Sequence, residues 1–186
     1  MDRNGSPAGS YRWRGGGLRP QHAAKVGEKN WHSLAWPKEY GGLGASHMEH
    51  VIYREEMAYY AVPGIDMGVG GVNWIGPTLQ IFGTEEQKKR HLPKIAAGET
   101  FWCTAYSEPE VGSDMASMRC RAVRKGNEYV INGQKVWISG GHRADWCWLG
   151  ARTDPDVPKH RGITLILVDM KTPGITVKPL LNMADS

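Results

Sequence analysis

Apolar positions in the first half of the chain recur with the period of an α-helix. They begin after Ser46, which forms a capping-box pattern with Glu49, and they predict a helix over residues 46–61. A second helical stretch is predicted over much of residues 65–82, interrupted near Gly76 and Pro77. A capping box that begins at Thr84 opens a further helix over residues 84–98, and a short helix is expected within residues 21–34. The first half is therefore predicted to be helical.

The pattern changes to alternation after about residue 99. Strands are predicted at residues 101–107, 117–124, 128–131, 135–139, 145–151, 163–170 and 175–179. Asn132 and Gly133 tolerate the positive φ of a type I′ turn, so they are predicted to join two of these strands as a hairpin. The resulting fold class is α+β. A disordered leader (1–20) precedes a helical domain (21–100) and an antiparallel β-barrel or sandwich domain (101–186).

Composition narrows the class of protein. The chain has 186 residues, with 40% hydrophobic and 23% charged residues, as in soluble globular proteins. A formal charge of +4, spread along the chain, gives no reason to expect a nucleic acid as a partner. No apolar run is long enough to span a membrane, so no membrane association is expected. Three separated cysteines and the lack of an apolar leader segment favour a reducing, cytoplasmic location.

Two familiar classes of site do not match the sequence. The glycine-rich residues 68–73 lack the third glycine of a dinucleotide-binding loop and follow no predicted strand. His47 and His50 have neither of the zinc-protease histidine spacings, and the cysteines form no C-x-x-C pair. No metal site is predicted.

Two segments carry groups that are suited to a ligand. Residues 104–114 run from a strand into a loop with hydroxyls, Pro109 and Gly112, and residues 136–141 place Trp137 and Ser139 before two glycines. An indole surface with small donors around it is what a planar heteroaromatic cofactor requires. Taken by themselves, both segments are equally compatible with structural turns.

Four stretches together resemble the acyl-CoA dehydrogenase family. They are WPKEYGGLG (36–44), FGTEEQKKRHLPKIAAGE (82–99), YSEPEVGSD (106–114) and INGQKVWISGG (131–141). The resemblance runs from about residue 30 to the last residue. It implies a helical domain, a middle β-barrel and a C-terminal four-helix domain, with FAD between the last two. The chain is expected to end before that third domain and so to be a fragment.

The resemblance also implies which residues hold FAD. The cofactor-binding residues carried over in this way are Thr104, Ala105, Tyr106, Ser107, Gly112, Ser113, Trp137, Ile138 and Ser139. Ser113 is also implied to bind substrate. Trp137 would flank the isoalloxazine ring, and Ser139 would bond near its N5 atom.

The implied reaction is α,β-dehydrogenation of an acyl-CoA to a trans-2-enoyl-CoA, with hydride transfer to flavin N5. No catalytic residue is assigned in this chain, because the family's catalytic carboxylate lies in the C-terminal domain, so the isolated chain is expected to be inactive. Expected partners are an acyl-CoA, the electron-transfer flavoprotein as electron acceptor, and further copies in a homodimer or homotetramer. Straight, branched and steroid side-chain acyl groups remain open. The alternatives are a non-catalytic remnant that binds flavin, acyl-CoA or another protein, and an acyl-CoA oxidase.

Overall fold

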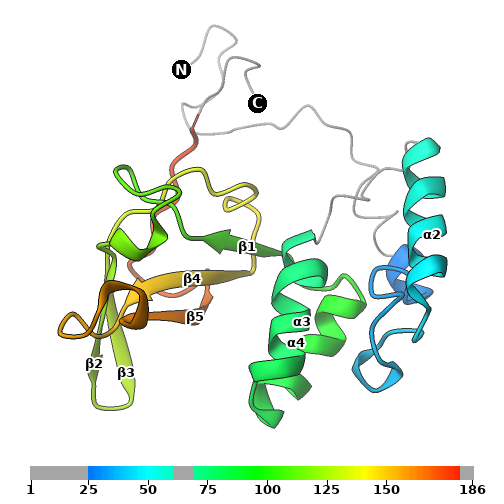
Figure 1. The fold of residues 1–186 in the computed structure, drawn as a ribbon, viewed down its shortest axis with the longest axis horizontal. Coiled ribbons are helices and arrows are strands. Elements are labelled where there is room, and N and C mark those ends of the chain that lie inside the picture. The colour runs from blue at the N-terminus through cyan, green and yellow to red at the C-terminus, as the bar shows by residue number, and fades with distance from the viewer. Residues whose placement is uncertain (1–24, 61–68, 181–186) are drawn as a thin grey trace, which may run out of the picture.

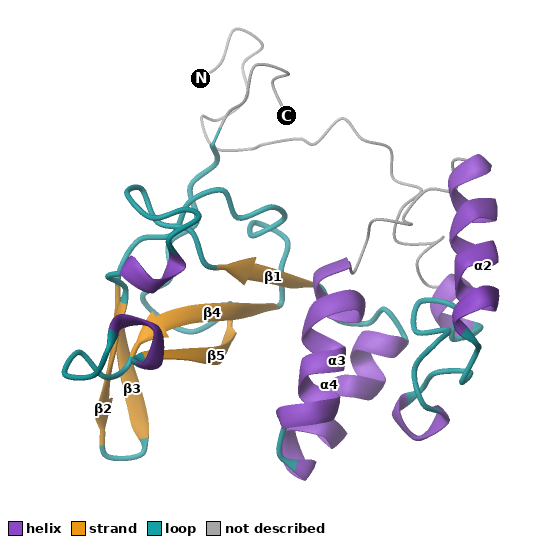
Figure 2. Ribbon diagram, in the orientation of Figure 1, coloured by secondary structure: helices purple, strands orange, loops and turns teal. Residues whose placement is uncertain are grey.

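The computed structural model describes residues 25–60 and 69–180, with a helical part that leads into a sheet (Figures 1 and 2). The helices are α2 (His47–Tyr59), α3 (Gly76–Phe82) and α4 (Glu85–Ala96), and the π-helical segment Val69–Ile75 runs directly into α3. The predicted helical first half is thus confirmed over the described residues. Of the helix expected within 21–34, residues 25–28 are helical, while the predicted leader lies outside the described residues.

Both predicted capping boxes form. The Ser46 amide donates to Glu49 Oε2 at 2.7 Å, and the Thr84 amide donates to Gln87 Oε1 at 2.9 Å. The side chains of Ser46 and Thr84 in turn accept from the amides of Glu49 and Gln87. These bonds satisfy donors that the start of a helix leaves unpaired. None of the helices in the described ranges is long and apolar enough to cross a bilayer.

The helical part meets the sheet through a shared apolar core. Ile75, Leu79, Leu92 and Ile95 are buried together with three tryptophans, which are Trp36, Trp102 and Trp148. A Cβ built at Gly76 would lie 2.0 Å from the Trp36 ring, so a residue without a side chain is required there. The predicted interruption near Gly76 and Pro77 corresponds to the change from π-helical to α-helical geometry at this position.

His91 occupies the boundary between helices and sheet. Its ring lies edge-on to Trp102 at 5.2 Å and to Trp146 at 4.7 Å between centroids, and only 4% of the residue is exposed. The two indoles are themselves stacked at 5.6 Å. Burial, followed by the nearby charges of Arg90 and Lys94, lowers the pKa of His91. The neutral imidazole is thus favoured at this boundary.

Among the residues that the structure describes, the sheet has five strands, three of which pair with β4. The strands are β1 (Trp102–Ala105), β2 (Arg121–Lys125), β3 (Glu128–Asn132), β4 (Trp146–Arg152) and β5 (Ile163–Asp169). β4 pairs antiparallel with β5, parallel with β1 along its first half, and parallel with β2 at Arg152. The helical domain followed by a β domain is confirmed, but the sheet is mixed and the expectation of antiparallel pairing alone was wrong.

The predicted hairpin turn was also placed wrongly. β2 and β3 pair from Arg121 with Asn132 to Lys125 with Glu128, so the turn lies at Gly126, whose φ is +62°, and Asn127. Gly133 follows the paired region and packs against Cys120, where a Cβ would lie 2.6 Å from the sulfur. The glycine serves close packing and not a turn. The predicted strands at 135–139 and 175–179 are likewise not strands.

Candidate cofactor site

The structure brings the two predicted site segments side by side. The Val136 amide donates to the carbonyl oxygen of Ser107 at 3.0 Å, although the two residues belong to separate loops. The 104–113 segment leaves the end of β1, and the 137–139 segment follows the chain that leaves β3. Sequence order alone does not predict this adjacency, because it depends on the path that the chain takes after β3.

Residues at the start of the 104–113 segment face the protein interior. Thr104 and Ala105 end β1, and the Ala105 side chain is buried against Cys103, Cys147 and Leu149. Tyr106 packs against the core that the helices and sheet share, where burial raises the pKa of its hydroxyl and the Trp148 side chain hydrogen-bonds to it. Ala105 and Tyr106 therefore offer mainly their backbone groups to a ligand.

The end of this segment, at Gly112 and Ser113, is open. A turn forms where the Glu108 amide donates to Val111 O at 2.8 Å and the Val111 amide donates back to Glu108 O at 3.0 Å. Gly112 and Ser113 follow it and are exposed. A Cβ added at Gly112 would have no heavy atom of another residue within 4 Å. The surroundings of Gly112 and Ser113 thus leave room for another molecule.

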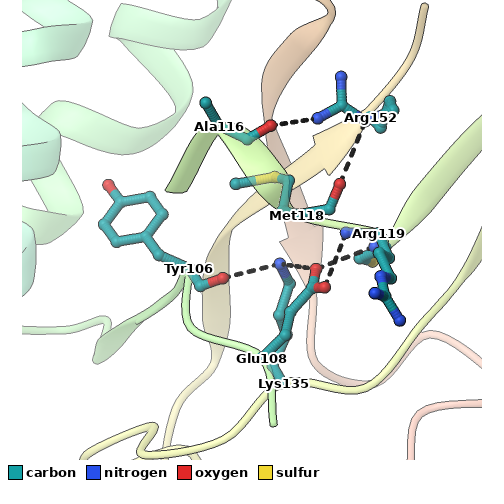
Figure 3. Close-up of polar contacts among 8 residues, drawn as sticks. Tyr106, Glu108, Ala116, Met118, Arg119, Lys135 and Arg152 are labelled. Atoms are coloured by element: carbon teal, nitrogen blue, oxygen red, sulfur yellow. Dashed lines mark hydrogen bonds and ion pairs between the residues drawn. The ribbon is translucent and has the colours of Figure 1, made fainter. Parts of the chain in front are cut away.

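Glu108 and Lys135 form a buried ion pair beneath these loops (Figure 3). The Lys135 ammonium lies 2.9 Å from Glu108 Oε1 and also donates to the carbonyl oxygen of Tyr106 at 2.9 Å. Glu108 accepts from the amides of Arg119 and Cys120 at 2.7 and 2.9 Å. Burial alone would raise the Glu108 pKa, but the amides of Arg119 and Cys120 and the Lys135 side chain outweigh burial, so the pKa is lowered.

This pair was missed by sequence reasoning. The available signal is a pair of opposite charges, since Glu108 lies within the 104–114 segment and Lys135 directly precedes the 136–141 segment. Charges that flank apolar strand ends are most often solvated, so the pattern by itself does not identify a buried pair.

Trp137 has an unusual backbone and an open side chain. Its φ is +60°, and 76% of the residue is exposed. The left-handed region costs an L-residue with a side chain roughly 1–2 kcal/mol, and such outliers are concentrated at functional sites. Ser139 is exposed as well, whereas Ile138 turns inward and packs on the cluster around Cys103 and Cys147. The 137–139 segment therefore presents an indole and a hydroxyl outward.

The arrangement suits a flat, partly apolar ligand better than a metal ion. An exposed indole offers a stacking surface, and neighbouring loops offer hydroxyls and amides for its rim. Within residues 25–60 and 69–180, no group of three histidine, cysteine or carboxylate side chains is arranged to hold a metal. Glu108, the buried carboxylate below the loops, is paired and has a lowered pKa, so it is a weak proton acceptor.

Comparison with known proteins identifies two matched regions. The sequence model of the acyl-CoA dehydrogenase N-terminal domain matches residues 4–99, and that of the acyl-CoA dehydrogenase middle domain matches residues 103–184. The acyl-CoA dehydrogenase FadE29 of Mycobacterium tuberculosis is 44% identical over 157 residues, which are 84% of this chain and 40% of FadE29.

Solved structures show the same likeness. The Tcur3481-Tcur3483 steroid ACAD is 40% identical with a TM-score of 0.85, over 92% of this chain and 44% of that one. A glutaryl-CoA dehydrogenase from Mycobacterium smegmatis in complex with FADH2 is 30% identical with a TM-score of 0.69, over 84% of this chain and 39% of that one. The chain thus spans well under half the length of each of these three proteins.

Proposed function

Because this chain belongs to the acyl-CoA dehydrogenase family, we propose that it supplies one wall of the FAD site in an enzyme that dehydrogenates an acyl-CoA thioester between its α and β carbons. The observation that carries the proposal is the side-by-side placement of the 104–113 and 137–139 segments, which we call the cradle. Trp137 stands exposed on one of its loops, and Gly112 and Ser113 are open on the other. We keep the division into domains 21–100 and 101–186 as part of this proposal, and the two matched ranges, 4–99 and 103–184, support its boundary near residue 100.

The cradle residues fit a flavin by their chemistry. In this proposal Trp137 flanks the isoalloxazine ring of FAD, and the Ser139 hydroxyl bonds near the N5 atom of that ring. Ser107 and the backbone of residues 104–106 hold the polar pyrimidine edge of the same ring. Gly112 and Ser113 take the diphosphate, and Ser113 also lies close to the acyl-CoA. Bound FAD supplies the hydride acceptor. The protein supplies binding, orientation and exclusion of water.

The proposal assigns no catalytic base to the cradle. Removal of a proton next to a thioester requires a carboxylate with a raised pKa, in a site sheltered from water. Glu108 has the opposite property, since its pKa is lowered and its oxygens already accept two amides and an ammonium. We therefore expect little turnover of acyl-CoA from the 186-residue chain alone.

Substrate, acceptor and assembly are finer parts of the same proposal. The likeness to a steroid ACAD places steroid side-chain acyl-CoAs first among the substrates to test, before branched and straight-chain ones. We propose electron-transfer flavoprotein as the acceptor and a homodimer or homotetramer as the assembly. Consumption of oxygen in place of reduction of a dye would favour the oxidase alternative.

A titration of the chain with FAD tests the cofactor role. We expect binding that weakens about fivefold or more in Trp137→Ala, since stacking on an aromatic side chain contributes roughly 1 kcal/mol or more. Trp74→Ala is the matched control, because Trp74 is an exposed tryptophan in the π-helical segment outside the cradle. Equal binding by Trp137→Ala and wild type would contradict the stacking role, and a wild-type chain that binds no flavin would favour the non-catalytic alternative.

A further inference from the structure

We infer that Lys135 is a positioning residue for the cradle: with its charge balanced by Glu108, it fixes the 104–113 segment against the 137–139 segment and polarises the peptide between Tyr106 and Ser107. The effect of Lys135 on cofactor binding rests on the proposed function. The mechanical part of the inference concerns the chain alone.

The geometry places one ammonium at the junction of three stretches of chain. Lys135 stands two residues before Trp137, and its Nζ contacts the Tyr106 carbonyl oxygen and Glu108 Oε1, both at 2.9 Å (Figure 3). Glu108 also accepts from the Arg119 amide at Oε2 and from the Cys120 amide at Oε1. The hydrogen bond from the Val136 amide to the Ser107 carbonyl oxygen joins the same two loops through the backbone.

Burial separates this pair from an ordinary surface salt bridge. The side chains of Lys135 and Glu108 are 10% and 7% exposed, whereas those of the nearby Arg119–Glu110 pair are 78% and 69% exposed. A buried ion pair pays a desolvation cost that often cancels its attraction, and an apolar pair of similar size is frequently no worse for stability. The benefit of a charge here is therefore a defined geometry, since an ammonium that donates to two fixed oxygens admits few arrangements.

The contact with the Tyr106 carbonyl has a second, electrostatic effect. The carbonyl of Tyr106 and the N–H of Ser107 belong to one peptide group. A cation at the oxygen draws electron density from that group, which makes the N–H a stronger donor. Ser107 is one of the residues proposed to hold the polar edge of the ring. Lys135 thus acts on a ligand through the backbone without touching it.

A purely structural role makes different predictions. If the Glu108 carboxylate alone fixed the 104–113 segment, the amides of Arg119 and Cys120 would hold that segment in place. Loss of Lys135 would then change little in the 137–139 segment. If Lys135 positions the cradle, then Lys135→Met loosens both segments while Lys135→Arg largely restores them. Lys88→Met is the matched control, because Lys88 has a similarly shielded side chain, 14% exposed, that pairs with Glu85 on α4.

Amide hydrogen exchange of the chain without flavin tests the mechanical part. We expect exchange at the Val136 amide to rise several-fold in Lys135→Met, to return towards wild type in Lys135→Arg, and to stay unchanged in Lys88→Met. Circular dichroism shows whether each variant keeps its fold. If Lys135→Met does not fold, Lys135→Gln and Glu108→Gln provide the comparison. Wild-type exchange at Val136 in folded variants without the ammonium would overturn the inference.

Flavin titration and the midpoint potential of bound flavin test the electrostatic part. We expect Lys135→Met to bind FAD about tenfold more weakly, because the Ser107 N–H becomes a weaker donor and the segment that carries it loosens, and to shift the potential to a more negative value. Unchanged affinity and potential would overturn this part. A wild-type chain that binds no FAD contradicts the proposed function instead, and amide exchange then decides by itself whether Lys135 fixes the two segments.

Discussion

The imidazole of His91 lies edge-on to the indole of Trp146, with 4.7 Å between the ring centroids. This contact joins α4 to the first residue of β4, at the boundary between the helices and the sheet. Protonation of the imidazole would place a charge in a buried aromatic environment, near the positive charges of Arg90 and Lys94.

The first prediction concerns the pH dependence of stability at this boundary. The pKa of His91 is lowered by folding, so the unfolded chain binds more protons than the folded chain, and stability rises with pH. The contribution of His91 is complete above the ordinary histidine pKa of about 6.5 and is lost as the pH falls below that value. Thermal midpoints measured from pH 8 to pH 5 are expected to show this loss.

The control for His91 is the exposed His142. His91→Phe is expected to flatten the dependence near pH 6, and His142→Phe is expected to leave it unchanged. An unaltered slope in His91→Phe would show that other groups dominate in this range.

The second prediction concerns the contact between Gly76 and Trp36. Alanine at position 76 gains helix propensity, but its Cβ would lie 2.0 Å from the Trp36 ring, which must then move within a packed core. We expect Gly76→Ala to lower the free energy of unfolding by about 1–3 kcal/mol, measured by urea denaturation. Gly112→Ala, where the added Cβ meets nothing within 4 Å, is expected to stay within about 0.5 kcal/mol of wild type. Similar effects of both changes would contradict the steric explanation.

The third prediction separates folding from cofactor binding at Trp137. Glycine relieves the left-handed backbone of this residue, and the exposed indole makes little contribution to the core. Trp137→Gly is therefore expected to keep or raise the free energy of unfolding, by up to about 1 kcal/mol, while it weakens flavin binding. Calorimetry and FAD titration on one sample check both effects. A marked loss of stability would show that the indole packs against the protein.

The fourth prediction concerns the cysteines. Cys103, Cys120 and Cys147 are all free and buried. Burial raises the pKa of Cys120, and the hydrogen bond with Cys103, followed by burial, raises that of Cys147. We expect slow reaction of these thiols with a thiol reagent at pH 8 in the native protein and fast reaction of all three in urea. Rapid modification of one thiol in the native state would mean that the sheet opens locally.

Sequence patterns predicted the helices and most strands because their signals are local. The capping boxes at Ser46 and Thr84 require only residues three positions apart, and both form. The hairpin was misplaced because Gly126-Asn127 and Asn132-Gly133 carry similar turn signals, and only the packing of Gly133 against Cys120 distinguishes them. The parallel pairing of β1 with β4 joins residues about 44 positions apart, for which no local pattern exists.

The motifs in the sequence named residues for a cofactor site, which stays a prediction, but they gave no sign of the buried groups that support the two loops. Motifs pointed to Ser107 and Trp137, which lie on two loops that are adjacent in space. The pair of Glu108 and Lys135 escaped detection because burial of a charge depends on distant backbone amides, here those of Arg119 and Cys120. The positive φ of Trp137 was equally invisible, since it follows from the path of the chain and not from the residue type.

Trp102 connects α4 with the cradle, because its side chain contacts the helix and its backbone belongs to β1. Its ring contacts His91 on α4, and its backbone begins β1, a strand of four residues that ends at the first part of the cradle. Such a short strand, paired along its whole length with β4, has little freedom to absorb displacement. Because Trp102 contacts α4 at one end of β1 and Ala105 leads into the cradle at the other, we expect a change in the packing of α4 on the sheet to shift the position of Ser107.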